Sequence, residues 1–165
     1  MALSASTTLP FPVDQVTAVL ANEEFQSHVS AHVGGTLESF IVDGDLTGAF
    51  STTSIRTLPT TRLPDIARKF VGENLTVTQV EKWSAPAADG SRESSINLKI
   101  SGAPLDVNAV QRLVADGAST RVELEGTVTS SVPFLGAKIA DAAEPMVGKA
   151  LKIQAQQAQA WLESH

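Results

Sequence analysis

Four polar residues could do chemistry, because the period of two in a β-strand turns each of them toward apolar neighbours. Gln79 and Glu81 lie on one predicted strand, Gln111 on another, and Arg56 on a third, where it shares a face with Phe50. Polar groups in an apolar interior cost free energy unless they are paired, and a few of them commonly orient a ligand. We therefore predict that these four residues contact the polar part of a bound molecule.

The same periodicity predicts the apolar walls around that polar part. Inward residues recur at every second position of a strand, and on the C-terminal helix they follow a stripe at spacings of three and four. The remaining predicted ligand contacts are Trp83, Leu98, Val107 and Leu124 on strands and Met146 and Ala150 on the helix. Trp83 and Trp161 are each more typical of core packing than of ligand stacking.

Other interpretations of the polar residues compete with ligand contact. A bulge or a register change would turn them to solvent, because a slip of one residue exchanges the two faces of a strand. Arg56 and Glu81 could instead form an ion pair with a structural role only. If Glu81 is buried, its raised pKa would make it a candidate general acid or base.

A possible metal-ligand pattern occurs on a predicted helix near the N-terminus. Glu24, His28 and His32 lie at spacings of four and so share one helix face, as imidazole and carboxylate ligands do. The segment lacks the Glu that directly follows the first His in helical zinc proteases. We interpret the pattern as a surface helix face, and we predict neither a metal nor another cofactor.

Composition excludes several classes of function. The 165 residues contain 12 Lys and Arg against 18 Asp and Glu, for a net charge of −6, with no basic cluster that could follow a nucleic-acid backbone. No Cys or Tyr is present, which removes thiolate and phenol chemistry and fits a reducing compartment. Phosphate-binding glycine loops, the G-x-S-x-G elbow and the dinucleotide fingerprint are absent. Without a signal peptide pattern or an apolar run of about 20 residues, we predict a cytoplasmic protein with no transmembrane segment.

The elements that must position these residues follow from changes in hydrophobic period. A strand over 3–9 precedes two short helices, at 13–20 and 23–32, and Asn22 is suited to cap the second. Six strands forming three hairpins follow, with a loop over 59–72; they are predicted at 36–42, 46–57, 75–83, 92–100, 105–115 and 119–131. The pattern predicts one α+β domain over residues 1–165.

The last element is predicted to be a long amphipathic helix over 134–163, where the period changes to 3.6. Pro145 lies inside it and removes one backbone donor, so we expect a kink or a break near 142–144 and two pieces, 136–143 and 145–163. If a ligand enters the protein, the junction between these pieces is where we expect movement.

This order of elements, with the turn at 133–136 before the last helix and Trp161-Leu162 near its end, resembles the START-like (SRPBCC, helix-grip) superfamily. More closely, the chain resembles an uncharacterised actinobacterial family within it, through segments 3–8, 25–32, Trp83 and 132–136. The resemblance implies a curved seven-stranded antiparallel sheet around the long helix. It also implies a cavity between them, used in that superfamily for lipids, sterols, polyketides or plant hormones and sometimes for catalysis.

We therefore predict that the protein binds or carries an apolar small molecule, such as a lipid or a polyketide-like compound. The resemblance brings no shared catalytic motif with it, and one fold hosts many activities. One alternative is a cyclase, dehydratase or hydrolase-like enzyme that uses the inward carboxylate of Glu81. Another is an interaction scaffold with a filled core and an exposed apolar patch.

Overall fold

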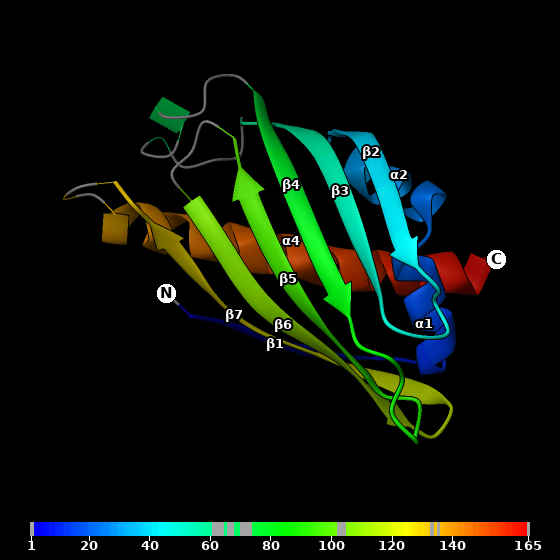
Figure 1. The fold of residues 1–165 in the computed structure, drawn as a ribbon. Helices are drawn as coiled ribbons and strands as arrows, with labels where there is room; N and C mark the ends of the chain where they lie inside the picture. The colour runs from blue at the N-terminus through cyan, green and yellow to red at the C-terminus, as the bar shows by residue number, and fades with distance from the viewer. Residues whose placement is uncertain are drawn as a thin grey trace.

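The computed structural model describes residues 2–60, 65, 68–69, 74–101, 105–132, 134 and 136–164. A twisted sheet lies over one long helix, and two short helices pack at one end of it (Figure 1). The elements are β1 (Ala2–Leu9), α1 (Val13–Leu20), α2 (Glu23–His32), β2 (Thr36–Gly44), β3 (Phe50–Pro59), β4 (Asn74–Trp83), β5 (Arg92–Ile100), β6 (Leu105–Asp116), β7 (Ser119–Ser130) and α4 (Gly136–Ser164). The predicted loop over 59–72 and the turn at 133–136 fall largely outside the described residues.

The sheet has seven strands in the order β1-β7-β6-β5-β4-β3-β2, and every neighbouring pair is antiparallel. Consecutive strands from β2 to β7 are therefore neighbours, and β1 adds to the free edge of β7. The predicted α+β architecture is confirmed. Within the part of the chain that the structure describes, no helix combines the length and the apolarity that a membrane span requires.

The start of α2 shows how local sequence sets an element boundary. The Asn22 side chain accepts a hydrogen bond from the backbone N–H of Phe25 at 3.0 Å, as predicted for a capping residue. Glu23 and Glu24 follow in the first turn, where the helix dipole favours negative charge. The chain leaves the helix through Gly34, whose φ of +82° suits glycine.

The turn between β2 and β3 lies later than predicted. The predicted turn covers 43–45, yet β2 continues through Gly44, which pairs with Phe50 at the start of β3, so only Asp45 of the predicted turn lies in it. Asp45 makes the turn, because its carboxylate accepts hydrogen bonds from the backbone N–H and the hydroxyl of Thr47 at 2.9 and 2.8 Å.

The predicted break in the last helix is wrong, because α4 is one helix from Gly136 to Ser164 with Pro145 inside it. A proline removes a single backbone donor, and the turns on both sides keep their own hydrogen bonds. The helix also packs against β7 and β1, and further along against α1 and α2, so both halves are held by tertiary contacts. Figure 1 shows α4 crossing the molecule beneath the sheet as one rod.

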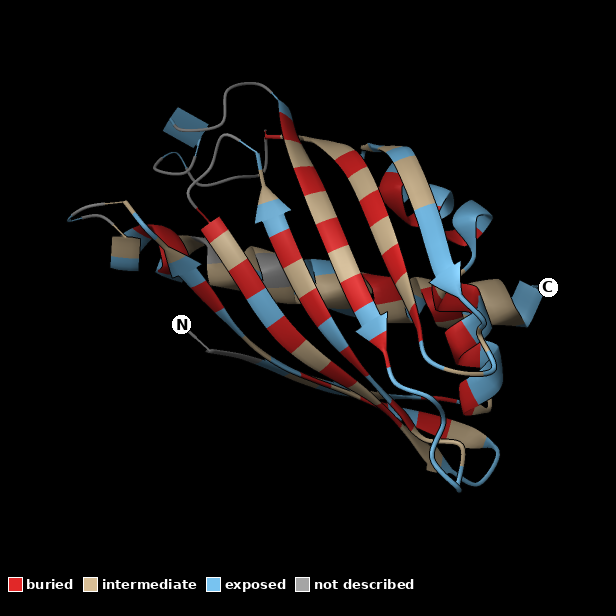
Figure 2. Ribbon diagram, viewed as in Figure 1, coloured by how far each residue is buried: buried red, intermediate tan, exposed pale blue. Residues whose placement is uncertain are grey.

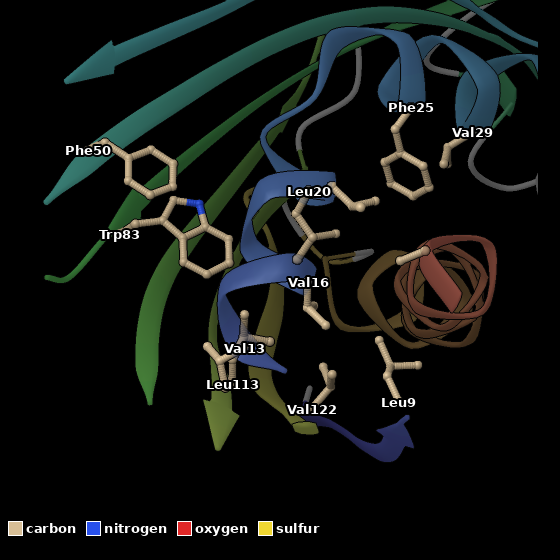
Figure 3. Close-up of a cluster of buried hydrophobic side chains, with 12 residues drawn as sticks. Leu9, Val13, Val16, Leu20, Phe25, Val29, Phe50, Trp83, Leu113 and Val122 are labelled. Atoms are coloured by element: carbon tan, nitrogen blue, oxygen red, sulfur yellow. The ribbon is translucent and has the colours of Figure 1, made fainter. Parts of the chain in front are cut away.

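Two apolar clusters fill the interior. The first, called the sheet cluster, joins β4–β7 to the start of α4 and contains Leu75, Val77, Ile96, Leu98, Leu105, Val107, Ala109, Leu124, Val128, Ile139 and Ala140. The second, called the helix cluster, joins α1 and α2 to the end of α4 (Figure 3) and contains Leu9, Val13, Val16, Val19, Leu20, Phe25, Val29, Phe50, Trp83, Leu113, Val122 and Ala158. Both clusters follow from inward residues at alternate strand positions, which produce the banded burial along β3–β7 in Figure 2.

Gly126 on β7 is required by close packing, which gives a testable prediction. A Cβ at this position would lie 2.7 Å from the Cβ of Ala109 and 2.7 Å from the backbone oxygen of Asn108. Overpacking of this kind costs about 1–3 kcal/mol, so Gly126→Ala should lower the free energy of unfolding by that amount in urea titrations. As a control, a Cβ at Gly148 of α4 would meet nothing within 4 Å. Gly148→Ala should therefore raise stability by up to about 1 kcal/mol, and equal losses in both variants would contradict the packing argument.

Candidate functional site

The four polar residues predicted to face inward all lie in the interior. The exposed fractions of their side chains are 8% for Arg56, 7% for Gln79, 4% for Glu81 and 6% for Gln111. The alternative in which a register change turns them to solvent is therefore wrong. Their contact with a ligand stays a prediction.

Buried polar side chains form a band between the two apolar clusters. Along β4, Gln79 and Glu81 lie between Val77 of the sheet cluster and Trp83 of the helix cluster. Other elements continue the same layer, so polar groups cross the interior from β3 to α4. The polar band, as it is called below, consists of Thr52, Ser54, Arg56, Gln79, Glu81, Ser94, Gln111 and Gln154.

The polar band is concentrated on two neighbouring strands. β3 contributes Thr52, Ser54 and Arg56, and β4 contributes Gln79 and Glu81. The register places Ser54 opposite Gln79 and Thr52 opposite Glu81. Across β5–β7 the inward residues are mostly apolar, so the inner face of the sheet has a polar half and an apolar half.

Arg56 has only neutral hydrogen-bond partners. One terminal nitrogen donates to Oε1 of Gln26 at 3.1 Å and to Oγ of Ser54 at 3.3 Å, while Nε is buried without a partner. Gln26 is held in turn, because its amide donates to the carbonyl of Leu20 at 2.8 Å. Among the described residues, no carboxylate oxygen lies within 4.0 Å of the guanidinium. The predicted alternative of a direct Arg56–Glu81 ion pair is therefore wrong.

Glu81 is a buried carboxyl group with hydrogen-bond donors on its own strand. Burial raises its pKa from 4.5 to about 7 and outweighs the lowering effects of hydrogen bonding by Gln79, the charge of Arg56 and hydrogen bonding by Trp83. Burial also lowers the pKa of Arg56, against the attraction of Glu81. The two groups thus interact through space without touching, and Glu81 is poised to gain or lose a proton near neutral pH.

Among the described residues, four buried side-chain polar atoms have no hydrogen-bond partner. They are Nε of Arg56, Oγ of Ser94, Nε2 of Gln111 and Oε2 of Glu144. Beside Gln111 and Gln154 lies a cavity of about 10 Å³, which is room for roughly one water molecule. Native proteins leave few such atoms unpaired, so the band as it stands is incomplete.

The other predicted contacts divide into buried and accessible residues. Trp83, Leu98, Val107 and Leu124 are buried. Trp83 stacks on Phe50 with ring centroids 5.6 Å apart and planes 7° apart, which is the core packing considered for it (Figure 3). On α4, Met146 is half-buried and Ala150 is exposed, so the structure does not enclose the two helix residues of the predicted set.

Sequence analysis missed several polar residues of this region. Ser94 alternates with Ile96 and Leu98 on β5, so the same period of two could have found it. Gln154 lies on the stripe of α4 between apolar residues, which is also a detectable pattern. Gln26 had no such signal, because its role depends on Arg56, which lies 30 residues further along the chain.

The helix face with the metal-ligand spacing is exposed, as predicted. Glu24, His28 and His32 are all exposed. Nε2 of His28 lies 3.1 Å from Oε1 of Gln157, and its ring centroid lies 5.7 Å from that of Trp161. In the described residues, no group of three His, Cys, Asp or Glu side chains is placed to hold a metal ion.

A second hollow, of about 570 Å³, lies on the opposite face of the sheet. It is open to solvent, and its walls are outward residues of β4–β7, among them Lys82, Asn97, Asn108 and Thr127. Arg112 at its margin is already paired with Glu93 at 3.3 Å and Glu125 at 3.6 Å. This surface depression contains no unpaired buried polar atom, so we place the candidate site on the inner face.

Comparison with known proteins gives a family and a fold. A family model described as a protein of unknown function, DUF2505, matches residues 4–162. Uncharacterised proteins of Mycobacterium tuberculosis and Mycobacterium bovis are 31% identical over 109 residues, which cover 63% of this chain and 62% of each relative. The chain thus spans less than two thirds of the length of these curated relatives.

Solved structures match over nearly the whole chain at low identity. A START superfamily protein from Mycobacterium smegmatis matches with a TM-score of 0.56 and 11% identity, over 99% of this chain and 97% of that one. An aromatase/cyclase from a Streptomyces species matches with a TM-score of 0.56 and 14% identity, over 96% and 88%. The predicted resemblance is confirmed: the chain belongs to the DUF2505 family and has the START-like, helix-grip fold.

Proposed function

We propose that the protein binds an apolar small molecule between the inner face of the sheet and α4, with the polar part of the molecule against the polar band. The observation that carries this proposal is that three atoms of the polar band, Nε of Arg56, Oγ of Ser94 and Nε2 of Gln111, are buried without a hydrogen-bond partner. Each such atom costs free energy, and a ligand that pairs with it recovers that cost.

The arrangement of the helices supports the polar half of the inner face as the binding region. α4 packs on β7 and β1, and α2 packs on β2, whereas the described residues of β3, β4 and β5 have no extensive backbone contact with a helix. The polar half of the inner face therefore lies between the two lines of helix packing.

Native mass spectrometry of the protein isolated from its own host tests the proposal. A small molecule that remains bound under native conditions and is released on unfolding is the expected result.

A fluorescence titration tests the proposal in a second way. The fluorescence of the neutral fluorophore N-phenylnaphthylamine should increase to saturation as protein is added. Leu98→Trp, which fills the inner face, should abolish the enhancement, while Val80→Trp on the outer face of the same sheet should not. A folded protein with no bound molecule and no saturable enhancement would refute the proposal.

A second candidate function is acid–base catalysis by Glu81. The observation that favours it is a single buried carboxyl group whose pKa is raised to about 7, because groups with such values transfer protons efficiently at neutral pH. The aromatase/cyclase with the same fold is an enzyme by its name. If this chain is one, Glu81→Gln should abolish turnover of a polyketide-like substrate and leave its binding intact, and unchanged turnover would exclude Glu81 as the proton carrier.

The scaffold alternative has little support among the described residues. Three large apolar side chains are exposed there: Ile41 and Val42 on β2, and Phe134 before α4. Ile41 and Val42 are adjacent in sequence and point to opposite faces of the strand. They do not form a patch of the several hundred Å² that marks an interaction surface.

A further inference from the structure

Two arginines are buried among the residues that the structure describes, and they differ in their hydrogen-bond partners. Arg92 donates to the carbonyl oxygens of Leu46 and Gly48, and its guanidinium lies 5.4 Å from the ring centroid of Phe50. The two carbonyl acceptors and the aromatic ring together explain a structural role for Arg92. Arg56 is equally buried but has two neutral side-chain partners and an unused Nε. A buried cation without an anionic partner is costly, so Arg56 is a position where a ligand's charge would be stabilising.

The hydrogen bonds of Arg56 leave the Nε–H of its guanidinium without an acceptor. The Gln26 amide is anchored by the Leu20 carbonyl, so its oxygen holds one terminal nitrogen of Arg56 in place. Nε, on the side edge, has no protein acceptor. The terminal nitrogen beside Nε, Nη2, already donates to Gln26 and Ser54, so the unused donor is the Nε–H, and a carboxylate is the acceptor that forms the strongest hydrogen bond with a charged donor of this kind.

The unpaired atoms of the polar band are mostly donors. Arg56 Nε and Gln111 Nε2 can only donate, and the Ser94 hydroxyl can donate or accept. Only the Glu144 oxygen requires a donor when ionised. A ligand that completes this wall must therefore bring acceptor oxygens rather than N–H groups. Next to these donors, the sheet cluster offers Leu98, Val107 and Val128 as an apolar surface.

We infer that the polar end of the ligand is a carboxylate that accepts the free Nε–H of Arg56, so that the ligand is an apolar organic acid. The inference rests on the proposed binding function and names its ligand class. It also gives Glu81 a role, because a neutral Glu81 leaves Arg56 free to pair with the ligand, whereas an ionised Glu81 competes for the same positive charge. Among the described residues, Glu144 on α4 also has a buried carboxylate oxygen without a hydrogen-bond partner.

A matched pair of ligands tests the inference. Naphthoic acid and naphthamide, or dodecanoic acid and dodecanamide, share a carbon skeleton and differ in charge. In displacement of N-phenylnaphthylamine, the acid should bind at least about tenfold more tightly than the amide. Arg56→Gln should remove this preference and leave the affinity for the amide unchanged. Arg121→Gln, at an exposed ion pair with Glu123, should keep the preference.

Equal affinities of acid and amide for the wild-type protein would overturn the inference and leave the proposed function standing. Failure of the fluorophore and of both ligands to bind would refute the proposed function itself. If Arg56→Gln does not fold, pH supplies an independent test with the wild-type protein. The preference for the acid should be larger at about pH 6 than at about pH 8, and Glu81→Gln should preserve it at the higher pH. A preference that does not change with pH in the wild type would contradict the placement of the carboxylate at Arg56.

Discussion

Replacing Phe25 by alanine is expected to lower the free energy of unfolding by about 3–5 kcal/mol. The Phe25 side chain is fully buried, and its ring meets that of Trp161 edge to face with centroids 5.7 Å apart. It therefore joins α2 to the end of α4 inside the helix cluster. Truncation removes both the burial of the ring and the aromatic pair, and it leaves a cavity that the surrounding helices cannot fill completely.

Urea denaturation followed by circular dichroism measures this loss. The matched control is Ile41→Ala on the edge strand β2, where the side chain is 61% exposed. Its truncation should change the free energy of unfolding by no more than about 0.5 kcal/mol. A loss below about 1 kcal/mol for Phe25→Ala would mean that α2 is not held to α4 as described.

Glu81→Gln should make the protein more stable at alkaline pH and remove most of the fall in stability between pH 4 and 8. The folded-state pKa of Glu81 is raised from 4.5 to about 7. Below 4.5 the carboxyl group is protonated in both states and costs nothing. As the pH rises toward 7, the unfolded state loses its proton first, so the wild-type protein loses stability across this window and the loss is complete above 7.

The size of the effect follows from the shift in pKa. At about 1.4 kcal/mol per unit, the ionised Glu81 costs up to about 3 kcal/mol at pH 8. Glutamine keeps an acceptor for Gln79 and carries no charge, so the variant should match the wild type near pH 4 and exceed it by this amount near pH 8. Glu24→Gln on the exposed face of α2 is the control. Parallel pH profiles for the wild type and Glu81→Gln would show that burial of Glu81 does not govern the stability in this range.

The fold was largely predictable because apolar residues recur regularly along its elements, with a period of 2 in the strands and 3.6 in the helices. The bounds 92–100 of β5 and 23–32 of α2 were predicted without error, since each is closed by turn residues or a cap that act locally. The turn after β2 was predicted at 43–45, but β2 runs through Gly44 and β3 starts at Phe50, because residue type alone does not specify how far the pairing of two strands extends before the Asp45 side chain makes the turn. The continuity of α4 across Pro145 was not predictable from the helix alone, because packing on β7 and β1 holds it together.

The candidate site was predictable only in part. Strand parity identified Arg56, Gln79, Glu81 and Gln111 as inward residues, since a period of two needs no tertiary information. Strand parity predicts which face of the sheet a side chain occupies, but it does not identify the residue that the side chain contacts. The hydrogen bond between Arg56 and Gln26 depends on how α2 packs against the sheet. The absence of an ion pair at Glu81 among the described residues depends on the distances between strands.

The unbroken course of α4 has a mechanical consequence. Ile139 and Ala140 fix one end of the helix in the sheet cluster, and Ala158 fixes the other end in the helix cluster. A rod supported at two separated points resists bending between them, so the region around Pro145 is not a natural hinge. Any widening of the interior to admit a molecule then requires displacement of the sheet. Among the described strands, β3, β4 and β5 have no extensive backbone contact with a helix, although Arg56 of β3 donates a hydrogen bond to Gln26 of α2. Displacement of β3 and β4 would thus change the surroundings of Arg56 and Glu81.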